Sequence, residues 1–281
     1  MTILQSITLG IIQGLTEFLP VSSSGHLIFI PKLFGWADQG IGFDVVMHLG
    51  TLLAVVVYFR EKLWMIFCGF LGIKIKKFSD FPSASARDEG GFRISDFRRL
   101  AWLLILSIIP AGIIGLLFGD AIEQNLRIPE VIAIGFIFWG LVLWFADTYG
   151  KKENGLEKLN WKNALFIGCV QAIALIPGTS RSGITMTAGL FSKLDKKSTA
   201  EFSFLMSVPI IFLAGMTNVF EMFKNGLGDL SLSVLATGFI ASMLSGFFAI
   251  WGLMKIIQKW SFRPFVVYRI VVGLAILFFL I

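Results

Sequence analysis

The sequence has little charge and few residues from which a disulfide or metal framework could be built. Only 15% of its residues are charged, whereas a soluble domain carries about 25%, so an ordinary soluble fold is excluded. Its two cysteines, Cys68 and Cys169, both lie in apolar segments and form no disulfide or zinc pattern. No Lys or Arg precedes Lys32, so the first segment lacks the basic region of a cleavable signal peptide.

Apolar residues are what the sequence has in excess. They make up 56% of the chain, and the mean hydropathy is +0.81. Several apolar runs are long enough to cross a hydrocarbon core about 30 Å thick. We therefore expect an all-α polytopic membrane protein with six transmembrane helices. The expected spans are Val45–Phe59, Ala101–Phe118, Val131–Ala146, Phe202–Phe220, Val234–Met254 and Phe265–Ile281.

The net charge of +6 follows membrane topology rather than a nucleic-acid-binding face. Nine basic residues fall within 60–99, four within 151–162 and three within 255–263, whereas the segments 119–130 and 221–232 hold one each. Basic residues concentrate in cytoplasmic loops. The pattern therefore predicts that both termini lie outside, and it predicts no nucleic-acid partner.

Two further apolar segments do not fit as crossings once this orientation is applied. Residues 159–197 begin and end on the cytoplasmic side, and residues 1–40 precede a span that starts outside. We expect two re-entrant helical hairpins that enter the membrane from opposite faces. The predicted inverted-topology repeats are residues 1–158, with a cytoplasmic loop at 60–99, and residues 159–281. Each repeat begins with a hairpin and continues with three spans. Because the number of membrane crossings per repeat is odd, the second repeat is inverted relative to the first.

The two hairpins also share residues at a constant offset. A shift of 158 residues superimposes five identical positions, and similar repeats with broken helices build polar sites in membranes. The matching pairs are Gly10 with Gly168, Gln13 with Gln171, Ser22 with Ser180, Ser24 with Ser182 and Gly25 with Gly183.

The first hairpin combines a carboxylate, hydroxyls and a histidine around a helix break. Gln13 and Glu17 are four residues apart and share a helix face. Pro20 ends that helix, and Ser22–Gly25 and His26 follow. An ionisable residue at membrane depth is a functional candidate by default, and Glu17 could ligate a divalent cation or orient a base or a water. The alternative is that the serines and glycines only permit close helix packing.

The second hairpin predicts an anion site. In Pro177–Thr185, hydroxyl residues surround Arg181, and a helix resumes at Ile184. A helix N-terminus favours anions, and the guanidinium fork suits phosphate oxygens. The alternative is a structural arginine paired with a carboxylate, for which Glu17 is the candidate. Elsewhere, Asp44 and His48 are four residues apart at the start of a span. They could be metal ligands or support such ligands, but an interfacial polar pair is the favoured interpretation.

Arg269 lies within an apolar run and receives no role, and Phe78–Arg99 is interpreted as an extended cytoplasmic loop.

These motifs carry a family resemblance. The matching motifs are Gln13-x-x-x-Glu17 with Phe-Leu-Pro-Val-Ser-Ser-Ser-Gly-His26, then Pro-Gly-Thr-Ser-Arg181-Ser-Gly-x-Thr, and finally Tyr268-Arg269. Together they closely resemble the bacitracin-resistance family of undecaprenyl-diphosphate phosphatases. The resemblance implies interlocked inverted repeats and a phosphatase that depends on a divalent cation, Mg or Ca. Where this family carries Glu or Gln, the chain has Gln13, which leaves Glu17 as the single carboxylate of that motif.

The resemblance implies a reaction and a role for each matching residue. Undecaprenyl diphosphate would be hydrolysed to undecaprenyl phosphate and inorganic phosphate, which recycles the carrier lipid for cell-wall synthesis and confers bacitracin resistance. Ser23 would be the nucleophile and His26 the base or alternative nucleophile, while direct attack by water stays open. Glu17 would hold the cation, with Gln13, or polarise His26. The phosphate-binding residues would be Arg181, Ser22, Gly178, Ser180, Ser182 and Thr185.

Two rival functions remain at this point. A transporter or flippase of a polyprenyl phosphate would use the same anion site, but it would not need Ser23 and His26. A scaffold built on small-residue packing leaves Glu17, His26 and Arg181 unexplained. By resemblance, the protein is expected in the bacterial cytoplasmic (inner) membrane, and the sequence leaves a homodimer open.

Overall fold

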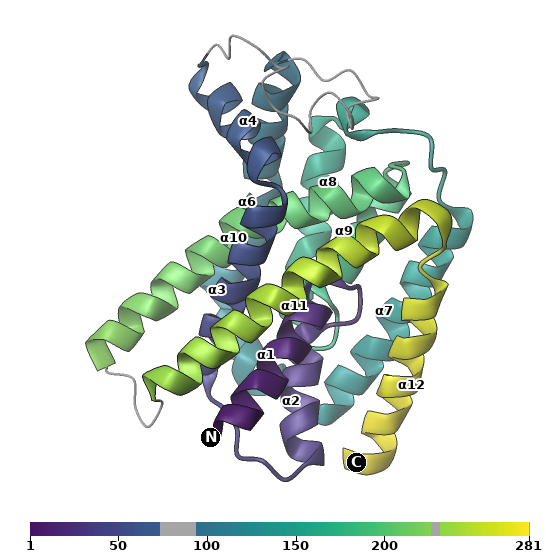
Figure 1. The fold of residues 1–281 in the computed structure, drawn as a ribbon. Coiled ribbons are helices and arrows are strands. Elements are labelled where there is room, and N and C mark those ends of the chain that lie inside the picture. Colours follow the sequence, from purple (N-terminus) through teal and green to yellow (C-terminus); the bar gives the residue numbers. More distant parts are fainter. Residues whose placement is uncertain (74–93, 226–230, 281) are drawn as a thin grey trace.

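The protein is built from helices (Figure 1). The computed structural model describes residues 1–73, 94–225 and 231–280. Its α-helices are α1 (Ile3–Phe18), α2 (Ser23–Leu33), α3 (Ile41–Tyr58), α4 (Arg60–Leu71), α6 (Ile94–Leu126), α7 (Pro129–Tyr149), α8 (Trp161–Gln171), α9 (Arg181–Phe191), α10 (Lys196–Asn225), α11 (Leu232–Lys259) and α12 (Arg263–Leu280). Two short 3-10 helices, η2 (Leu156–Lys158) and η3 (Ala172–Leu175), lie on either side of α8.

Six of the described helices are long and apolar enough to cross a membrane: α3, α6, α7, α10, α11 and α12. Each overlaps one of the six expected spans, which confirms an all-α polytopic membrane protein. Figure 1 shows the N- and C-termini at the same end of the molecule, as an even number of crossings requires.

The segment expected as a loop at 60–99 differs from the prediction. Residues 60–71 form α4, which packs against α6, and residues 94–99 begin α6. The sequence did not indicate α4, because its twelve residues begin with charged side chains and are too few to span a membrane. Residues 74–93, including most of the predicted Phe78–Arg99 loop, lie outside the described residues.

Each predicted hairpin is a pair of short helices. Pro20 follows the end of α1, and the break between η3 and α9 contains Pro177. The offset of 158 residues that relates the two sequences also relates the first residues of α1 and α8 and both ends of α2 and α9. Asn154, before α8, forms a β-bridge with Leu194, after α9, so the second hairpin returns to where it began. Entry of the hairpins from opposite membrane faces stays a prediction.

Small residues bring the first helix of each hairpin close to a spanning helix. A Cβ on Gly10 of α1 would lie 2.5 Å from the carbonyl oxygen of Gly238 in α11. A Cβ on Gly168, the equivalent residue in α8, would lie 2.3 Å from the carbonyl oxygen of Ser107 in α6. Both glycines therefore permit close backbone approach, as is common between helices in membranes. This packing fixes the C-terminal end of α1, where Glu17 lies, inside the bundle.

Candidate active site

The tips of the two hairpins have the same unusual backbone. Ser22, before α2, has φ 72° and ψ 94°, and Ser180, before α9, has φ 73° and ψ 110°. A positive φ is uncommon for a residue other than glycine, and such conformations cost about 1–3 kcal/mol each and cluster at functional sites. These serines are one of the pairs related by the 158-residue offset. The strained turns mark where the hairpins meet.

Glu17 is the centre of the polar cluster between these turns. Its side chain is only 6% exposed, and both carboxylate oxygens have partners. Oε1 lies 3.1 Å from Nη2 of Arg181, whereas Oε2 lies 2.7 Å from Oγ of Ser23, 3.0 Å from Nε2 of Gln13 and 3.4 Å from Nε2 of His48. The guanidinium of Arg181 lies close enough to favour the charged form of this carboxylate. Glu17 therefore joins the two hairpins as an ionised carboxylate.

Ser23 is the hydroxyl best placed for nucleophilic attack. It is half-buried at the first residue of α2 and donates to the carboxylate of Glu17. A hydroxyl paired with a base is the usual arrangement of an activated nucleophile. The neighbouring Ser24 is exposed, and its Oγ lies 3.4 Å from Oγ of Ser22.

His26 does not form the expected pair with Ser23. Its Nδ1 lies 2.7 Å from the carbonyl oxygen of Ser22, and its Nε2 lies 2.7 Å from the hydroxyl of Tyr268 in α12. The ring is buried, and burial favours its neutral form. A neutral histidine between these two partners braces the turn before Ser23, and the base next to Ser23 is Glu17.

His48 belongs to the site, although the sequence placed it at an interface with Asp44. The side chain projects from α3 toward Glu17, and its Nδ1 lies 2.7 Å from the carbonyl oxygen of Asp44. Both neighbours of the ring are hydrogen-bond acceptors, so only the doubly protonated ring can donate to both. One signal in the sequence pointed to it: the chain has only two histidines, and this one lies in an apolar span.

The hydroxyls of the second hairpin mainly hold the hairpin together. Ser182 donates to the carbonyl of Leu19 at the tip of the first hairpin. Ser180 Oγ accepts from Gly183 N–H at 3.1 Å and lies 3.3 Å from Ser182 Oγ. Thr185 Oγ1 lies 2.8 Å from the Arg181 carbonyl oxygen, 3.2 Å from the Ser182 carbonyl oxygen and 2.7 Å from Ser203 Oγ. Ser180 and Ser182 thus lie beside the site, whereas Thr185 points back toward α10.

Two buried donors next to these hydroxyls have no hydrogen-bond partner in the described part of the chain: Nε of Arg181 and Oγ1 of Thr179. Arg181 begins α9, so its guanidinium lies at a helix N-terminus, where the backbone also favours anions. Gly178 precedes it with φ +85°, and a Cβ there would lie 2.5 Å from the Ile132 carbonyl oxygen. The loop therefore requires glycine, and its unused donors suit a phosphate.

Arg269 holds the two hairpin tips at a fixed separation. The side chain is 0% exposed, and it donates only to backbone carbonyls. Its acceptors are Pro20 in the first tip, Gly178 and Thr179 in the second, and Gly135 and Phe136 in α7. The sequence left Arg269 unassigned, although an arginine inside an apolar span is a functional candidate by default.

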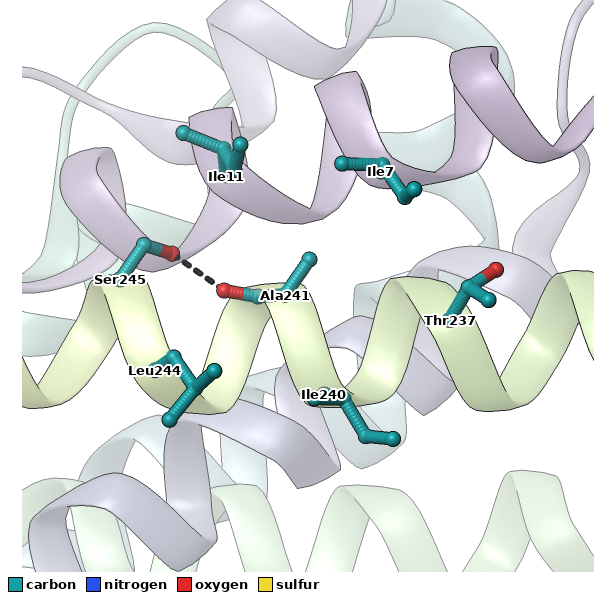
Figure 2. A pocket seen from close by; sticks show the side chains of 7 residues that line it. All are labelled: Ile7, Ile11, Thr237, Ile240, Ala241, Leu244 and Ser245. Atoms are coloured by element: carbon teal, nitrogen blue, oxygen red, sulfur yellow. Dashed lines mark hydrogen bonds between the residues drawn. The ribbon is translucent and has the colours of Figure 1, made fainter.

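An apolar groove between α1 and α11 lies apart from this chemistry. Figure 2 shows its lining residues, which are Ile7, Ile11, Thr237, Ile240, Ala241, Leu244 and Ser245. None of them is ionisable, and the hydroxyl of Ser245 donates to the Ala241 carbonyl within α11. The groove therefore offers no ionisable group, and both of its hydroxyls, those of Thr237 and Ser245, donate to carbonyls within α11.

The donor set around Glu17 limits what metal it could hold. Among the described residues, no three His, Cys, Asp or Glu side chains gather as a metal site. Oε1 of Gln13 is buried and has no hydrogen-bond partner in that part of the chain. One carboxylate and one free amide oxygen fit Mg²⁺, which commonly takes one or two carboxylates and completes its shell with substrate phosphates and water.

Comparison with known proteins covers nearly the whole chain. Residues 6–275 match the family model described as Bacitracin resistance protein BacA. The chain is 45% identical over 282 residues to Undecaprenyl-diphosphatase 1 of Pseudoalteromonas translucida (strain TAC 125), covering 100% of this chain and 99% of that protein. It is 45% identical to Undecaprenyl-diphosphatase 2 of Stutzerimonas stutzeri (strain A1501), covering 99% of this chain and 98% of that protein. It is 40% identical to Undecaprenyl-diphosphatase of Thioalkalivibrio sulfidiphilus (strain HL-EbGR7), covering 99% of each chain. The resemblance seen in the motifs is confirmed.

Proposed function

The chain belongs to the bacitracin resistance protein family, and we propose that it hydrolyses undecaprenyl diphosphate to undecaprenyl phosphate and inorganic phosphate. It is a multi-pass membrane enzyme that acts on a lipid. The lipid tail would stay in the bilayer while the diphosphate enters between the two hairpins. This reaction recycles the carrier lipid for cell-wall synthesis.

One observation carries the assignment of the site. The hydroxyl of Ser23 and the guanidinium of Arg181 bind the same carboxylate, that of Glu17, from different hairpins. A nucleophile, a base and an anion-binding cation thus lie within a few ångströms of one another. Phosphoryl transfer needs little more than such positioning and charge stabilisation.

The steps follow from this arrangement. Arg181 and the Thr179 hydroxyl bind the terminal phosphate through the donors that are free in the structure. Oγ of Ser23 attacks the terminal phosphorus as its proton passes to Glu17, and the phosphoanhydride bond breaks to release undecaprenyl phosphate. Water then attacks the phosphoserine, the bond between phosphorus and the Ser23 oxygen breaks, and Glu17 returns its proton to that oxygen. This step releases inorganic phosphate and restores both the Ser23 hydroxyl and the Glu17 carboxylate. Arg181 stabilises the charge that develops on the transferring group.

A divalent cation fits beside this machinery. Glu17 and Oε1 of Gln13 would hold Mg²⁺ or Ca²⁺ together with substrate oxygens. When bound, the cation would neutralise part of the diphosphate charge.

Phosphate release by the purified protein in detergent micelles tests the function. We expect inorganic phosphate to appear from undecaprenyl diphosphate, and its release to be lost in Arg181→Ala. Detergent abolishes any transmembrane gradient, so a transporter of polyprenyl phosphate would release none. Absence of phosphate release by the wild-type protein would contradict the proposal.

The proposed location is the bacterial cytoplasmic (inner) membrane, with both termini outside. Two observations support it: basic residues concentrate in the loops predicted to be cytoplasmic, and both termini lie at one end of the molecule (Figure 1). Cysteine labelling of whole cells near Met1 would test this orientation.

A further inference from the structure

Tyr268 is the one residue of α12 whose side chain is hydrogen-bonded to a histidine of the site. Its hydroxyl lies 2.7 Å from Nε2 of His26, and the two rings stack with centroids 5.6 Å apart and planes 8° apart. His26 is only 3% exposed, whereas Tyr268 is 44% exposed. The tyrosine therefore covers the outer face of a buried histidine.

The partners of His26 determine which ring nitrogen carries the proton. The acceptor at Nδ1 is the carbonyl oxygen of Ser22, which can only accept, so Nδ1 carries hydrogen. In the neutral ring Nε2 is then the acceptor, and the Tyr268 hydroxyl is its donor. Tyr268 thus stabilises the tautomer that holds the Ser22 carbonyl.

That carbonyl belongs to the strained turn before the proposed nucleophile. Ser22 has φ 72°, and its side chain makes no cap hydrogen bond to the N-terminus of α2. In the second hairpin, by contrast, the Ser180 side chain accepts from Gly183 N–H and caps α9. The first turn lacks that cap. Arg269 and Ser182 hold Pro20 and Leu19 at its start, and the His26 ring holds the carbonyl of Ser22 itself.

We propose that Tyr268 is a positioning residue for phosphoryl transfer: through the tautomer of His26 it fixes the Ser22 turn, and so holds Ser23 against Glu17. This inference rests on the proposed function. Tyr268 would then support the reaction while touching neither the substrate nor the nucleophile, and His26 would act as a brace for the Ser22 turn.

Tyr268→Phe is the test, because it removes the hydroxyl and keeps the ring that stacks on His26. We expect kcat for undecaprenyl diphosphate to fall about three- to tenfold, as for one lost neutral hydrogen bond, with KM changed less than twofold. Tyr149→Phe is the matched control, since Tyr149 is exposed and lies at the end of α7. Its kcat should equal that of the wild type.

The pH profile provides a readout that a purely structural role would not change. Two titratable or charged groups face His26 in the described part of the chain, the Tyr268 hydroxyl and the Arg269 guanidinium, while α7 contributes the ring of Phe136. A donor at Nε2 favours the neutral ring, so its removal favours protonation. The protonated ring carries hydrogen on Nδ1 whatever faces Nε2, so acid restores the bond to the Ser22 carbonyl. The loss of kcat in Tyr268→Phe should therefore be largest at high pH and shrink as the pH falls, whereas Tyr149→Phe should follow the wild type at every pH.

A double-mutant comparison separates this inference from the proposed function. Added to His26→Ala, Tyr268→Phe should lower the remaining rate no further, because its effect passes through His26. An unchanged kcat and pH profile in Tyr268→Phe, or an equal loss in both backgrounds, would overturn the inference and leave the phosphatase function standing. If the wild-type protein releases no phosphate, the proposed function itself fails.

Discussion

Oγ of Ser23 donates a 2.7 Å hydrogen bond to Oε2 of Glu17 across the break between α1 and α2. The two residues are six positions apart, so neither a helix nor a strand would place them in contact. The turn through Pro20 and Ser22 brings them together, and Arg181 from the other hairpin completes the cluster. This bond makes Ser23, rather than one of its serine neighbours, the predicted nucleophile.

Ser23→Ala should lower kcat by about 10³-fold or more, because removal of a nucleophile disables the whole catalytic unit. The measurement is phosphate release from undecaprenyl diphosphate in detergent. Ser24→Ala is the control, since it deletes an exposed hydroxyl that lies one residue away. Equal losses in both variants would show that the serine run, and not the bond to Glu17, determines activity.

His48→Ala should reduce kcat by about 10- to 100-fold, the effect of a lost hydrogen bond to a charged group. His48→Gln retains an N–H donor of similar reach and should recover most of that loss. Steady-state kinetics of both variants would decide the matter. If glutamine restores nothing, the contact of His48 with Glu17 is not what the reaction uses.

Gln13→Glu should sensitise the enzyme to divalent cations. It places a second carboxylate beside Glu17, and Mg²⁺ prefers such ligands, so half-maximal activation should occur at roughly tenfold lower Mg²⁺ after treatment with EDTA. Gln5→Glu is the control, because Gln5 forms the capping box of α1 and glutamate can replace glutamine there. An unchanged Mg²⁺ requirement in Gln13→Glu would place the cation elsewhere.

Arg269→Lys should destabilise the fold more than it alters the chemistry. Lysine offers no planar fork, so several of the five backbone carbonyls would stay buried without a donor, at about 1–3 kcal/mol each. The thermal midpoint in detergent should fall by roughly 10 °C or more. Arg263→Lys, at the exposed start of α12, should leave the midpoint unchanged. A small shift for Arg269→Lys would mean that the hairpin tips hold together without it.

The sequence identified the elements of this protein better than their contacts. Six spans follow from apolar runs, and the hairpins follow from Pro20 and Pro177 within polar interruptions. The pairing of Arg181 with Glu17, considered at first as a purely structural alternative, exists, and the same arginine retains a free Nε for an anion. Arg181 can therefore be both a partner of Glu17 and part of an anion site.

Contacts set by tertiary packing were beyond the sequence. His48 looked interfacial because it lies in the first turns of α3, but α1 enters the bundle far enough to reach it. His26 appeared to pair with Ser23, three residues away, yet its ring turns to Tyr268, 242 residues away. The local sequence pattern could not predict where either side chain points, because both orientations depend on where α3 and α12 pack.

The clamp formed by Arg269 also constrains the order in which the working protein can appear during synthesis. Translation produces the first hairpin tip near the start of the chain and the second midway, but the side chain that fastens both arrives only with the last described helix. Until α12 has been inserted, the two tips lack their common brace. A ribosome-bound chain that stops before Arg269 should therefore be membrane-embedded yet inactive, and insertion of α12 completes the active site.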